Sequence, residues 1–113
     1  MSASSSNLDR ALAALADPNR RRVIDLLRER PHRAGELAEA TRLSFPAMSR
    51  HLKTLRHSGL VDESRDEFDS RVRIYRLRPE AMTALKTWLA ETDALWARQL
   101  VALKTHLQQK TRK

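Results

Sequence analysis

The middle of the chain carries a basic, acid-free segment whose residue types suit binding to nucleic acid. Residues 44–59 read SFPAMSRHLKTLRHSG and contain three lysine or arginine side chains and no aspartate or glutamate. On a helix, Ser49, Arg50, Lys53 and His57 would share one polar, basic face. Such a face attracts phosphate groups and can donate hydrogen bonds to base edges in the major groove of DNA. The segment is therefore the main candidate for functional chemistry.

The end residues of this segment indicate one short amphipathic helix. The Ser44 hydroxyl group can cap its N-terminus, and Pro46 fits the first turn because the missing N–H is not needed there. Gly59 tolerates the left-handed conformation that ends many helices. Three apolar residues recur at intervals of four and three positions and would form the buried stripe: Met48, Leu52 and Leu55.

Similar signals predict helices before this segment. Short apolar repeats predict three of them, over residues 8–15, 18–30 and 34–41. Asp17 and Pro18 form the start of the second helix, as a cap followed by a proline in the first turn. Residues 42–43 join the third helix to the helix that begins after Ser44. Two short helices joined in this way form a helix-turn-helix.

After Gly59 the apolar period changes from that of a helix to that of a strand. Residues 60–65 and 71–77 predict two strands, and residues 66–70 would form the tip between them. A hairpin that directly follows a helix-turn-helix is the wing of a winged helix. The predicted fold is therefore mainly α-helical with a small β-hairpin, and its architecture is a winged helix-turn-helix.

A long helix over about residues 80–109 completes the predicted fold. Its apolar residues, with Trp88 and Trp96 on or beside them, recur in steps of three and four positions. This seam is longer than the core of so small a domain needs. Part of it is expected to pair with a second subunit, since a large apolar stripe in water favours aggregation. Asp93 could cap a further helix, so a break near this residue is left open.

Length and composition limit the classes of protein to which the chain can belong. Its 113 residues suit one domain, and its net charge of +8 favours an anionic partner. Without cysteine it can form no disulfide or thiolate metal site. We expect a cytoplasmic protein, because no signal peptide or membrane-spanning stretch is evident. The absence of a glycine-rich phosphate loop and of a nucleophile–base set argues against an enzyme.

Three blocks of the sequence resemble a known family in their order and spacing. They are ALADPNRRRVIDLL, AGELAEATRLSFPAMSRHLKTLRHSGLV and RVRIYRL, and they lie within residues 8–78. The blocks are similar to ArsR-type winged-helix transcriptional repressors, and the last helix resembles the branch of this family that lacks metal-sensing residues. The resemblance implies a homodimer that binds a palindromic operator in double-stranded DNA, represses transcription, and dimerises through its first and last helices.

The resemblance also assigns roles to single residues. The position after the capping serine is often a glutamine that reads bases. Here it is Phe45, which could pack on a thymine methyl group instead. Ser49 and Arg50 fall on reading positions, and Arg50 could bind guanine through two hydrogen bonds. Arg71 and Arg73 fall on the second wing strand, where the family contacts the DNA backbone or the minor groove.

Two positions depart from the family pattern. The wing tip usually carries glycine and basic residues, whereas here it carries Asp66, Glu67 and Asp69. Because carboxylates repel phosphate, the tip is expected to point away from DNA or to contact another partner. Arg33 stands where a threonine often caps the third helix, so fraying is expected at that helix start.

The sequence contains two sets of candidate functional residues. The predicted DNA-binding residues are Ser44, Phe45, Ala47, Ser49, Arg50, His51, Lys53, Arg56, Arg71 and Arg73. The predicted dimer-interface residues are Leu8, Leu12, Leu85, Trp88, Leu89, Trp96, Leu100 and Leu103. Within the first set, Lys53 and Arg56 would mainly hold phosphate groups. We expect residues 1–7 to be a disordered tail, residues 8–78 to form the DNA-binding domain with the first dimerisation helix, and residues 79–113 to form the C-terminal dimerisation helix and a basic tail.

Several alternative functions remain open. The histidines are not spaced as a metal site, so no metal or other cofactor is expected. The acidic tip could make the winged helix a protein-interaction module. A pocket near Trp88 and Trp96 could bind a small-molecule inducer that releases the repressor, and the repressor could regulate its own gene.

Four further residues have competing interpretations. Arg20, Arg21 and Arg22 could clamp phosphate, but ion pairs with acids of their own helix, such as Asp25, are the expected role. His51 lies at the edge of the apolar stripe. Packing or a phosphate contact is expected for it, rather than a proton switch.

Overall fold

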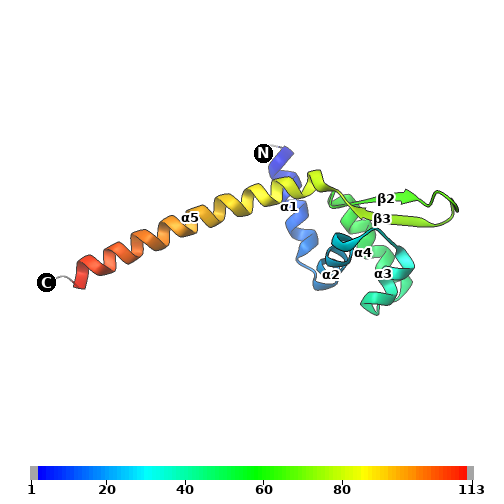
Figure 1. The fold of residues 1–113 in the computed structure, drawn as a ribbon, viewed down its shortest axis with the longest axis horizontal. Coiled ribbons are helices and arrows are strands. Elements are labelled where there is room, and N and C mark those ends of the chain that lie inside the picture. The colour runs from blue at the N-terminus through cyan, green and yellow to red at the C-terminus, as the bar shows by residue number, and fades with distance from the viewer. Residues whose placement is uncertain (1–2, 112–113) are drawn as a thin grey trace.

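The computed structural model describes residues 3–111 of the chain. This part contains, in order, α1 (Ala3–Leu15), α2 (Pro18–Glu29), β1 (His32–Arg33), α3 (Ala34–Thr41), α4 (Phe45–His57), β2 (Val61–Arg65), β3 (Arg73–Leu77) and α5 (Pro79–Thr111). The elements from α1 to β3 form a small body, and α5 leaves this body as one long helix (Figure 1). The molecule is therefore elongated, with extents of 74 × 32 × 21 Å.

The predicted helix-turn-helix is confirmed, and its local signals act as the sequence indicates. Ser44 caps α4 by accepting a hydrogen bond from the backbone N–H of Ala47 at 3.2 Å. Arg42 ends α3 in the left-handed conformation, with φ of 58°, and its N–H binds carbonyl groups of the last turn. Gly59 follows α4 with φ of 80°, as its role as a helix stop predicts. The predicted stripe of α4 is fully buried: Met48, Leu52 and Leu55.

The wing belongs to a three-stranded antiparallel sheet rather than to an isolated hairpin. β2 and β3 pair as predicted, with Glu63 opposite Tyr75. β1 pairs with the other edge of β3, so the strand order is β1-β3-β2. His32 and Arg33, which lie between two predicted helices, form this short strand, and the sequence does not predict it because two residues are too few to show a strand period. The placement of Arg71 on the second strand is also wrong: β3 begins at Arg73, and Arg71 lies in the wing loop.

The two terminal helices are longer than predicted. α1 begins at Ala3, so residues 3–7 are helical rather than disordered, while residues 1–2 lie outside the described residues. No proline or glycine interrupts this segment, and extending a formed helix adds one hydrogen bond per residue. α5 is continuous through Asp93, so the helix has no break there. Residues 112–113 of the expected basic tail also lie outside the described residues.

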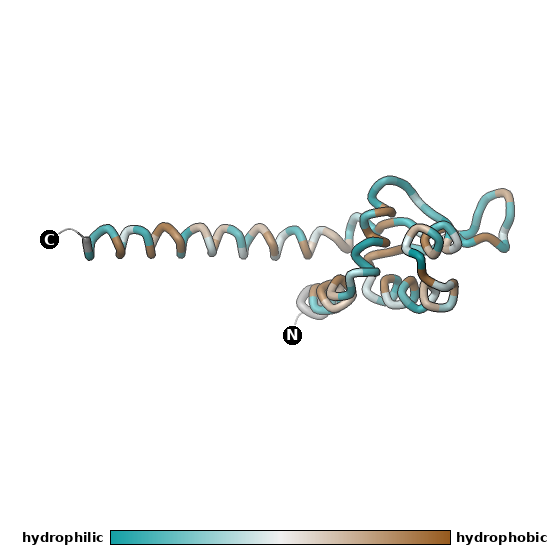
Figure 2. The backbone as a smooth tube through the Cα atoms, turned by 90° about the horizontal axis from the view of Figure 1, so that it is seen from below, coloured by the Kyte–Doolittle hydropathy of each residue, from teal (hydrophilic) through white to brown (hydrophobic). Residues whose placement is uncertain are grey.

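The core of the body lies where α1 to α4 meet the sheet. Its largest fully buried side chains come from α2, α3, α4 and the residues that lead into β2: Val23, Leu37, Met48, Leu52, Leu55, Leu60 and Val61. α1 adds Ala11 and Ala14, and it also packs against α5. Beyond the body, apolar residues continue to recur along α5 (Figure 2). No helix among residues 3–111 is long and apolar enough to cross a membrane.

Three consecutive arginines at the start of α2 hold the ends of two neighbouring helices. Arg20 and Arg21 donate hydrogen bonds to carbonyl groups at the end of α1, with 2.6 Å between Arg20 Nε and the Ala14 oxygen. Arg22 donates to a carbonyl group near the end of α3. Cations suit these positions because helix C-termini carry partial negative charge. The expected ion pairs with acids of α2, such as Asp25, are not found for these three arginines in the described structure.

We predict that Arg20→Ala lowers the free energy of unfolding by about 1–2 kcal/mol, because it removes charge-assisted hydrogen bonds to α1 carbonyl groups. Urea denaturation followed by circular dichroism would measure this loss. Arg28→Ala is the matched control, since its ion pair with Asp25 is exposed, and it should change stability by less than about 0.5 kcal/mol. Equal effects of the two variants would contradict a helix-holding role for Arg20.

Candidate nucleic-acid interface

The outer face of α4 presents the polar and basic side chains that its sequence predicts. Ser49, Arg50 and Lys53 are exposed, and Phe45 is 60% exposed in the first turn. Within residues 3–111, no hydrogen bond or ion pair engages the side chain of Arg50 or Lys53. Both positive charges are therefore available to an anion that approaches this face. Formation of the helix places them one turn apart, because residues three positions apart are neighbours on a helix.

Three members of the predicted DNA-binding set have structural roles in α4. The Ser44 hydroxyl group is used by the helix cap, and Ala47 is half-buried. His51 is also half-buried, and its Nδ1 lies 3.5 Å from a terminal guanidinium nitrogen of Arg20. Since Arg20 also binds the end of α1, these contacts join α1, α2 and α4. The packing interpretation of His51 agrees with this position.

A groove of about 460 Å³ lies between the outer face of α4 and the wing. Ser49, Arg50 and Lys53 line it from α4, and Arg73 and Tyr75 line it from β3. Arg56 of α4 also lines it, so the fold brings five of the predicted DNA-binding residues to one hollow, although they come from two segments about 20 residues apart in sequence. This hollow, called the α4–wing groove below, is the centre of the candidate interface.

One residue that sequence reasoning missed connects the two walls of this groove. Glu63, on β2, accepts a hydrogen bond from the Tyr75 hydroxyl group at 2.8 Å. Its carboxylate also forms ion pairs with Arg73 at 3.0 Å and with Arg56 of α4 at 3.1 Å. Only 15% of the Glu63 side chain is exposed. The contacts fix α4 relative to the wing, and they neutralise part of the positive charge that was predicted to hold phosphate.

The Tyr75 hydroxyl group keeps its proton to a higher pH than an ordinary tyrosine does. Burial of the hydroxyl group, together with its hydrogen bond to Glu63 and the negative charge of that carboxylate, raises the pKa of Tyr75 to about 12. The neutral hydroxyl therefore donates its hydrogen bond throughout the physiological pH range. The stability that this contact contributes is complete below the ordinary tyrosine pKa near 10, and it is lost as the pH rises from about 10 through about 12.

A second groove, of about 440 Å³, lies between the starts of α3 and α4 and the wing. Phe45 and Ser49 line it from α4, and Arg71 and Arg73 line it from the wing. Arg71 therefore faces the start of α4 although it is not on a strand. The two grooves share Ser49 and Arg73, so the reading positions of α4 and the arginines of the wing form one continuous surface.

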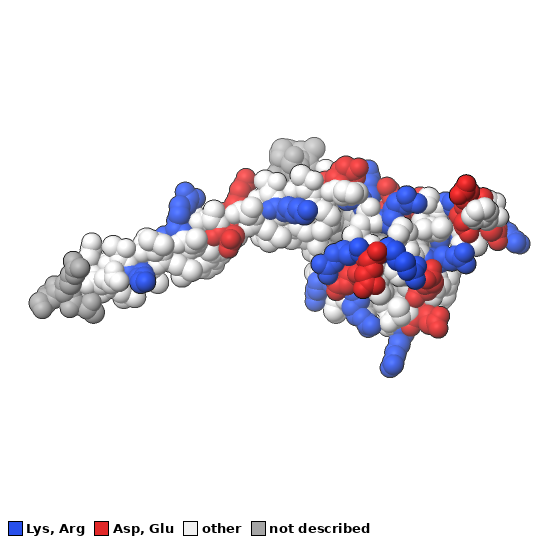
Figure 3. All heavy atoms as spheres, viewed as in Figure 1, with Lys and Arg blue, Asp and Glu red and all other residues white. Residues whose placement is uncertain are grey.

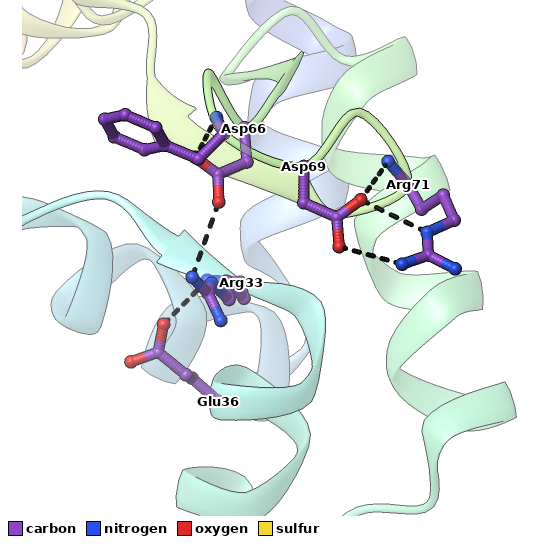
Figure 4. Close-up of polar contacts among 6 residues, drawn as sticks. Arg33, Glu36, Asp66, Asp69 and Arg71 are labelled. Atoms are coloured by element: carbon purple, nitrogen blue, oxygen red, sulfur yellow. Dashed lines mark hydrogen bonds and ion pairs between the residues drawn. The ribbon is translucent and has the colours of Figure 1, made fainter.

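Two of the three acids of the wing tip are held by arginines, and the sequence did not predict these pairs. Asp66 forms an ion pair with Arg33 at 3.5 Å, and Asp69 binds the guanidinium group of Arg71 (Figure 4). The hydrogen bonds from the Arg71 side chain and backbone lower the pKa of Asp69. Phe68 stands between these two acids and is 91% exposed. The tip therefore repels phosphate less than its three carboxylates suggest.

The start of α3 is also held by an acid. Glu36 accepts a hydrogen bond from the backbone N–H of Arg33 at 3.1 Å and one from the Arg30 side chain at 2.9 Å. These two contacts lower the pKa of Glu36. Although the Arg33 side chain makes no cap, as its type predicts, Glu36 satisfies the backbone in its place. The expected fraying at this helix start is therefore not found.

The predicted dimer residues fall into two groups. Leu85 is buried within the chain, in the first part of α5, and Leu8 is half-buried on α1. The remaining members are exposed by 36–59% of their surface: Leu12, Trp88, Leu89, Trp96, Leu100 and Leu103. Most of the predicted set is therefore open to a second molecule.

The described histidines lie on different parts of the fold. His32 is buried on β1, with its Nδ1 2.7 Å from the Arg30 carbonyl oxygen. His51 lies in the middle of α4 and His57 at its end. Among the described residues, no three histidine or acidic side chains are close enough together to hold a metal ion.

Comparison with known proteins gives consistent results. Residues 17–63 match the family of bacterial regulatory proteins described as the arsR family. The chain is 40% identical over 92 residues to the helix-turn-helix-type transcriptional regulator Rv2034 of Mycobacterium tuberculosis, covering 81% of this chain and 80% of the relative. It is 33% identical over 58 residues to the transcriptional repressor SdpR of Bacillus subtilis, covering 51% of this chain and 64% of the relative.

A solved structure shows the same fold. An ArsR-like transcriptional regulator from Rhodococcus sp. RHA1 superposes with a TM-score of 0.73 at 27% identity, covering 92% of this chain and 95% of the other. This likeness includes the long last helix, because almost the whole chain is covered. The predicted fold class, a winged helix-turn-helix with a long C-terminal helix, is confirmed.

We predict that the ultraviolet absorbance of tyrosinate appears with a midpoint near pH 12. Tyr75 is the single tyrosine of the chain, so the signal has one source. In Glu63→Gln the midpoint should fall but stay above 10, because burial, the larger cause, remains. Circular dichroism at each pH must show that the protein is still folded. A midpoint near 10 in the folded wild-type protein would contradict the burial of this hydroxyl group.

Proposed function

The chain belongs to the ArsR family of bacterial regulatory proteins, and from this premise we propose that it is a sequence-specific repressor that binds double-stranded DNA. Members of this family are transcriptional regulators rather than enzymes. The observation that carries the proposal is the α4–wing groove, where the uncompensated charges of Arg50 and Lys53 face the wing. Repression, rather than activation, is carried over from the relative named as a repressor.

The residues that line the two grooves would have different tasks on DNA. Phe45, Ser49 and Arg50, at the start and centre of α4, would contact base edges in the major groove. Lys53 would hold phosphate without regard to sequence. Arg71 and Arg73 would hold phosphate more weakly than free arginines, because each shares its charge with a carboxylate.

The proposed repressor acts as a homodimer on a palindromic operator. The exposed apolar side chains of α1 and α5 support this proposal, since water-exposed apolar surface of this extent favours association. Two copies would place two α4 helices in successive major grooves, about 34–36 Å apart. With DNA as the partner, the proposed location is the cytoplasm.

We propose that the repressor works without a metal ion, in accord with the scattered positions of His32, His51 and His57. Control of its own gene and release by a small molecule near Trp88 and Trp96 stay predictions.

Fluorescence anisotropy tests whether the protein controls its own gene. Binding to the DNA upstream of its coding region is compared with binding to a scrambled fragment at two salt concentrations. Equal weak binding to both fragments would contradict autoregulation.

We predict that Arg50→Ala and Lys53→Ala weaken DNA binding in different ways. Loss of Arg50 should cost about 1–3 kcal/mol on the operator and relax the preference at one base pair, because a base contact is lost. Loss of Lys53 should weaken binding to all sequences alike and reduce the salt dependence by about one phosphate contact. Anisotropy titrations with the operator and with random DNA measure both effects.

The opposite pattern would contradict these roles. Equal losses for Arg50→Ala on operator and random DNA would exclude base reading by this residue. A loss for Lys53→Ala that is confined to the operator would exclude a general phosphate contact. Arg28→Ala, which removes an exposed arginine of α2, serves as the control for the change in net charge.

A further inference from the structure

A pocket of about 620 Å³ lies on the body where α1, the start of α2 and the end of α4 meet. This volume lies within the range of pockets that hold small molecules. Among the residues that the structure describes, none of the predicted DNA-binding residues lines it. This hollow, called the α1–α4 pocket below, is therefore distinct from the two grooves of the candidate interface.

The charged groups that line the α1–α4 pocket are all basic. Arg10 comes from α1, Arg20 from α2 and His57 from α4. Acids and bases lie side by side over the face of the body that Figure 3 shows, but within residues 3–111 no carboxylate lines this pocket. The Asp17 carboxylate accepts backbone N–H groups as the cap of α2 and lies outside the lining. The pocket therefore attracts an anion.

Two hydrogen-bond donors of the pocket are uncommitted. Within the described part of the chain, no hydrogen bond or ion pair engages the Arg10 guanidinium group, and no hydrogen bond engages the Thr54 hydroxyl group. Arg20 is held in the wall instead, because its side chain donates to the carbonyl groups of Ala14 at 2.6 Å and Ala13 at 3.4 Å. An anion in the pocket would gain the donors of Arg10 and Thr54 and would meet a second guanidinium group whose position is fixed.

The size and the remaining lining of the pocket indicate what kind of anion fits. Beside the basic side chains, α1 contributes the small residues Ala13 and Ala14. A pocket of this volume takes a molecule of several heavy atoms rather than a single inorganic ion. The matching ligand is therefore an organic molecule that joins a phosphate or carboxylate group to a small apolar part.

The α1–α4 pocket adjoins the surface that is proposed to bind DNA. His57 lines both this pocket and the α4–wing groove. A negative charge in the pocket would therefore lie close to the face of α4 on which Arg50 and Lys53 attract phosphate. Because like charges repel, such a ligand would weaken the attraction between this face and the DNA backbone.

We propose that the α1–α4 pocket binds a small organic phosphate or carboxylate through Arg10, Arg20 and Thr54, and that its occupation weakens binding to DNA. The binding site stands on the pocket itself, whereas the effect on DNA rests on the proposed function. By linkage, DNA must weaken the binding of the anion by the same factor. The site is separate from the region of Trp88 and Trp96, because neither of them lines the pocket.

Phenyl phosphate is the probe for the binding site, because it joins an anionic group to a small apolar ring. Titration of the isotope-labelled protein, followed by two-dimensional NMR, should shift the backbone amide signals of Ala13, Ala14 and Ser58. Arg10→Ala should raise the Kd of the probe about tenfold, because charge-assisted hydrogen bonds are lost. Arg28→Ala is the matched control: it removes an exposed arginine of α2 outside the pocket and should leave this Kd unchanged.

Fluorescence anisotropy with the operator measures the effect on DNA. At saturating phenyl phosphate and constant ionic strength, the Kd of the wild-type protein for the operator should rise about fivefold or more. The Kd of Arg10→Ala should not respond to the same concentration of the probe. Without the probe, Arg10→Ala should bind the operator as tightly as Arg28→Ala, which loses the same charge.

Each outcome decides a part of the proposal. Equal losses of probe binding in Arg10→Ala and Arg28→Ala, or equal shifts with neutral phenol, would overturn the anion site. Weaker operator binding by Arg10→Ala without the probe would show that the pocket holds the DNA backbone, which also overturns it. Probe binding that leaves operator affinity unchanged would overturn only the effect on DNA. A protein that binds the probe but no DNA would contradict the proposed function and leave the site standing.

Discussion

The Glu63 carboxylate accepts contacts from three side chains on two different elements, and the position of the wing relative to α4 depends on them. Arg56 comes from α4, whereas Arg73 and Tyr75 come from β3. A carboxylate that is largely withdrawn from water is costly unless such partners surround it. If one of these three side chains is removed, the other two still compensate the negative charge of Glu63. The groove between α4 and the wing is therefore held by electrostatics as well as by the apolar core.

The same arrangement sorts the charges of the interface into two kinds. Acids of the wing and of β2 bind Arg33, Arg56, Arg71 and Arg73, and these pairs shape the surface. Arg50 and Lys53 have no acidic neighbour on α4, whose sequence contains none. These two charges on the outer face of α4 are therefore available to an approaching anion. A phosphate backbone would be attracted to the same face of α4 that carries the proposed base-reading positions.

Sequence reasoning succeeded where the signal is local. Ser44, Pro46 and Gly59 define α4 by capping chemistry, and each acts as predicted. Reasoning failed where the partner lies far along the chain. For Arg20 the sequence suggests an ion pair with an acid of α2, but its side chain donates hydrogen bonds to carbonyl groups of α1. A local sequence pattern does not show which helix ends lie close together.

The contacts of Glu63 could be predicted only by aligning two segments that are distant in sequence. Pairing the two predicted strands in register places Glu63 opposite Tyr75 and diagonally across from Arg73, which lies two residues from Tyr75 on the same face of the strand. Alignment of the hairpin would therefore have predicted these contacts. β1 gave no comparable signal, because it is formed by two residues that extend only when β3 is beside them.

Selection from a pool of random DNA duplexes, followed by sequencing of the bound fraction, tests the central claim most directly. The account requires that the protein reads base edges through two symmetry-related α4 helices. It therefore predicts enrichment of a two-fold symmetric sequence whose half-sites lie about one helical turn apart. Retention of duplexes without any enriched sequence would contradict base reading, and enrichment of a single unpaired half-site would contradict the dimer.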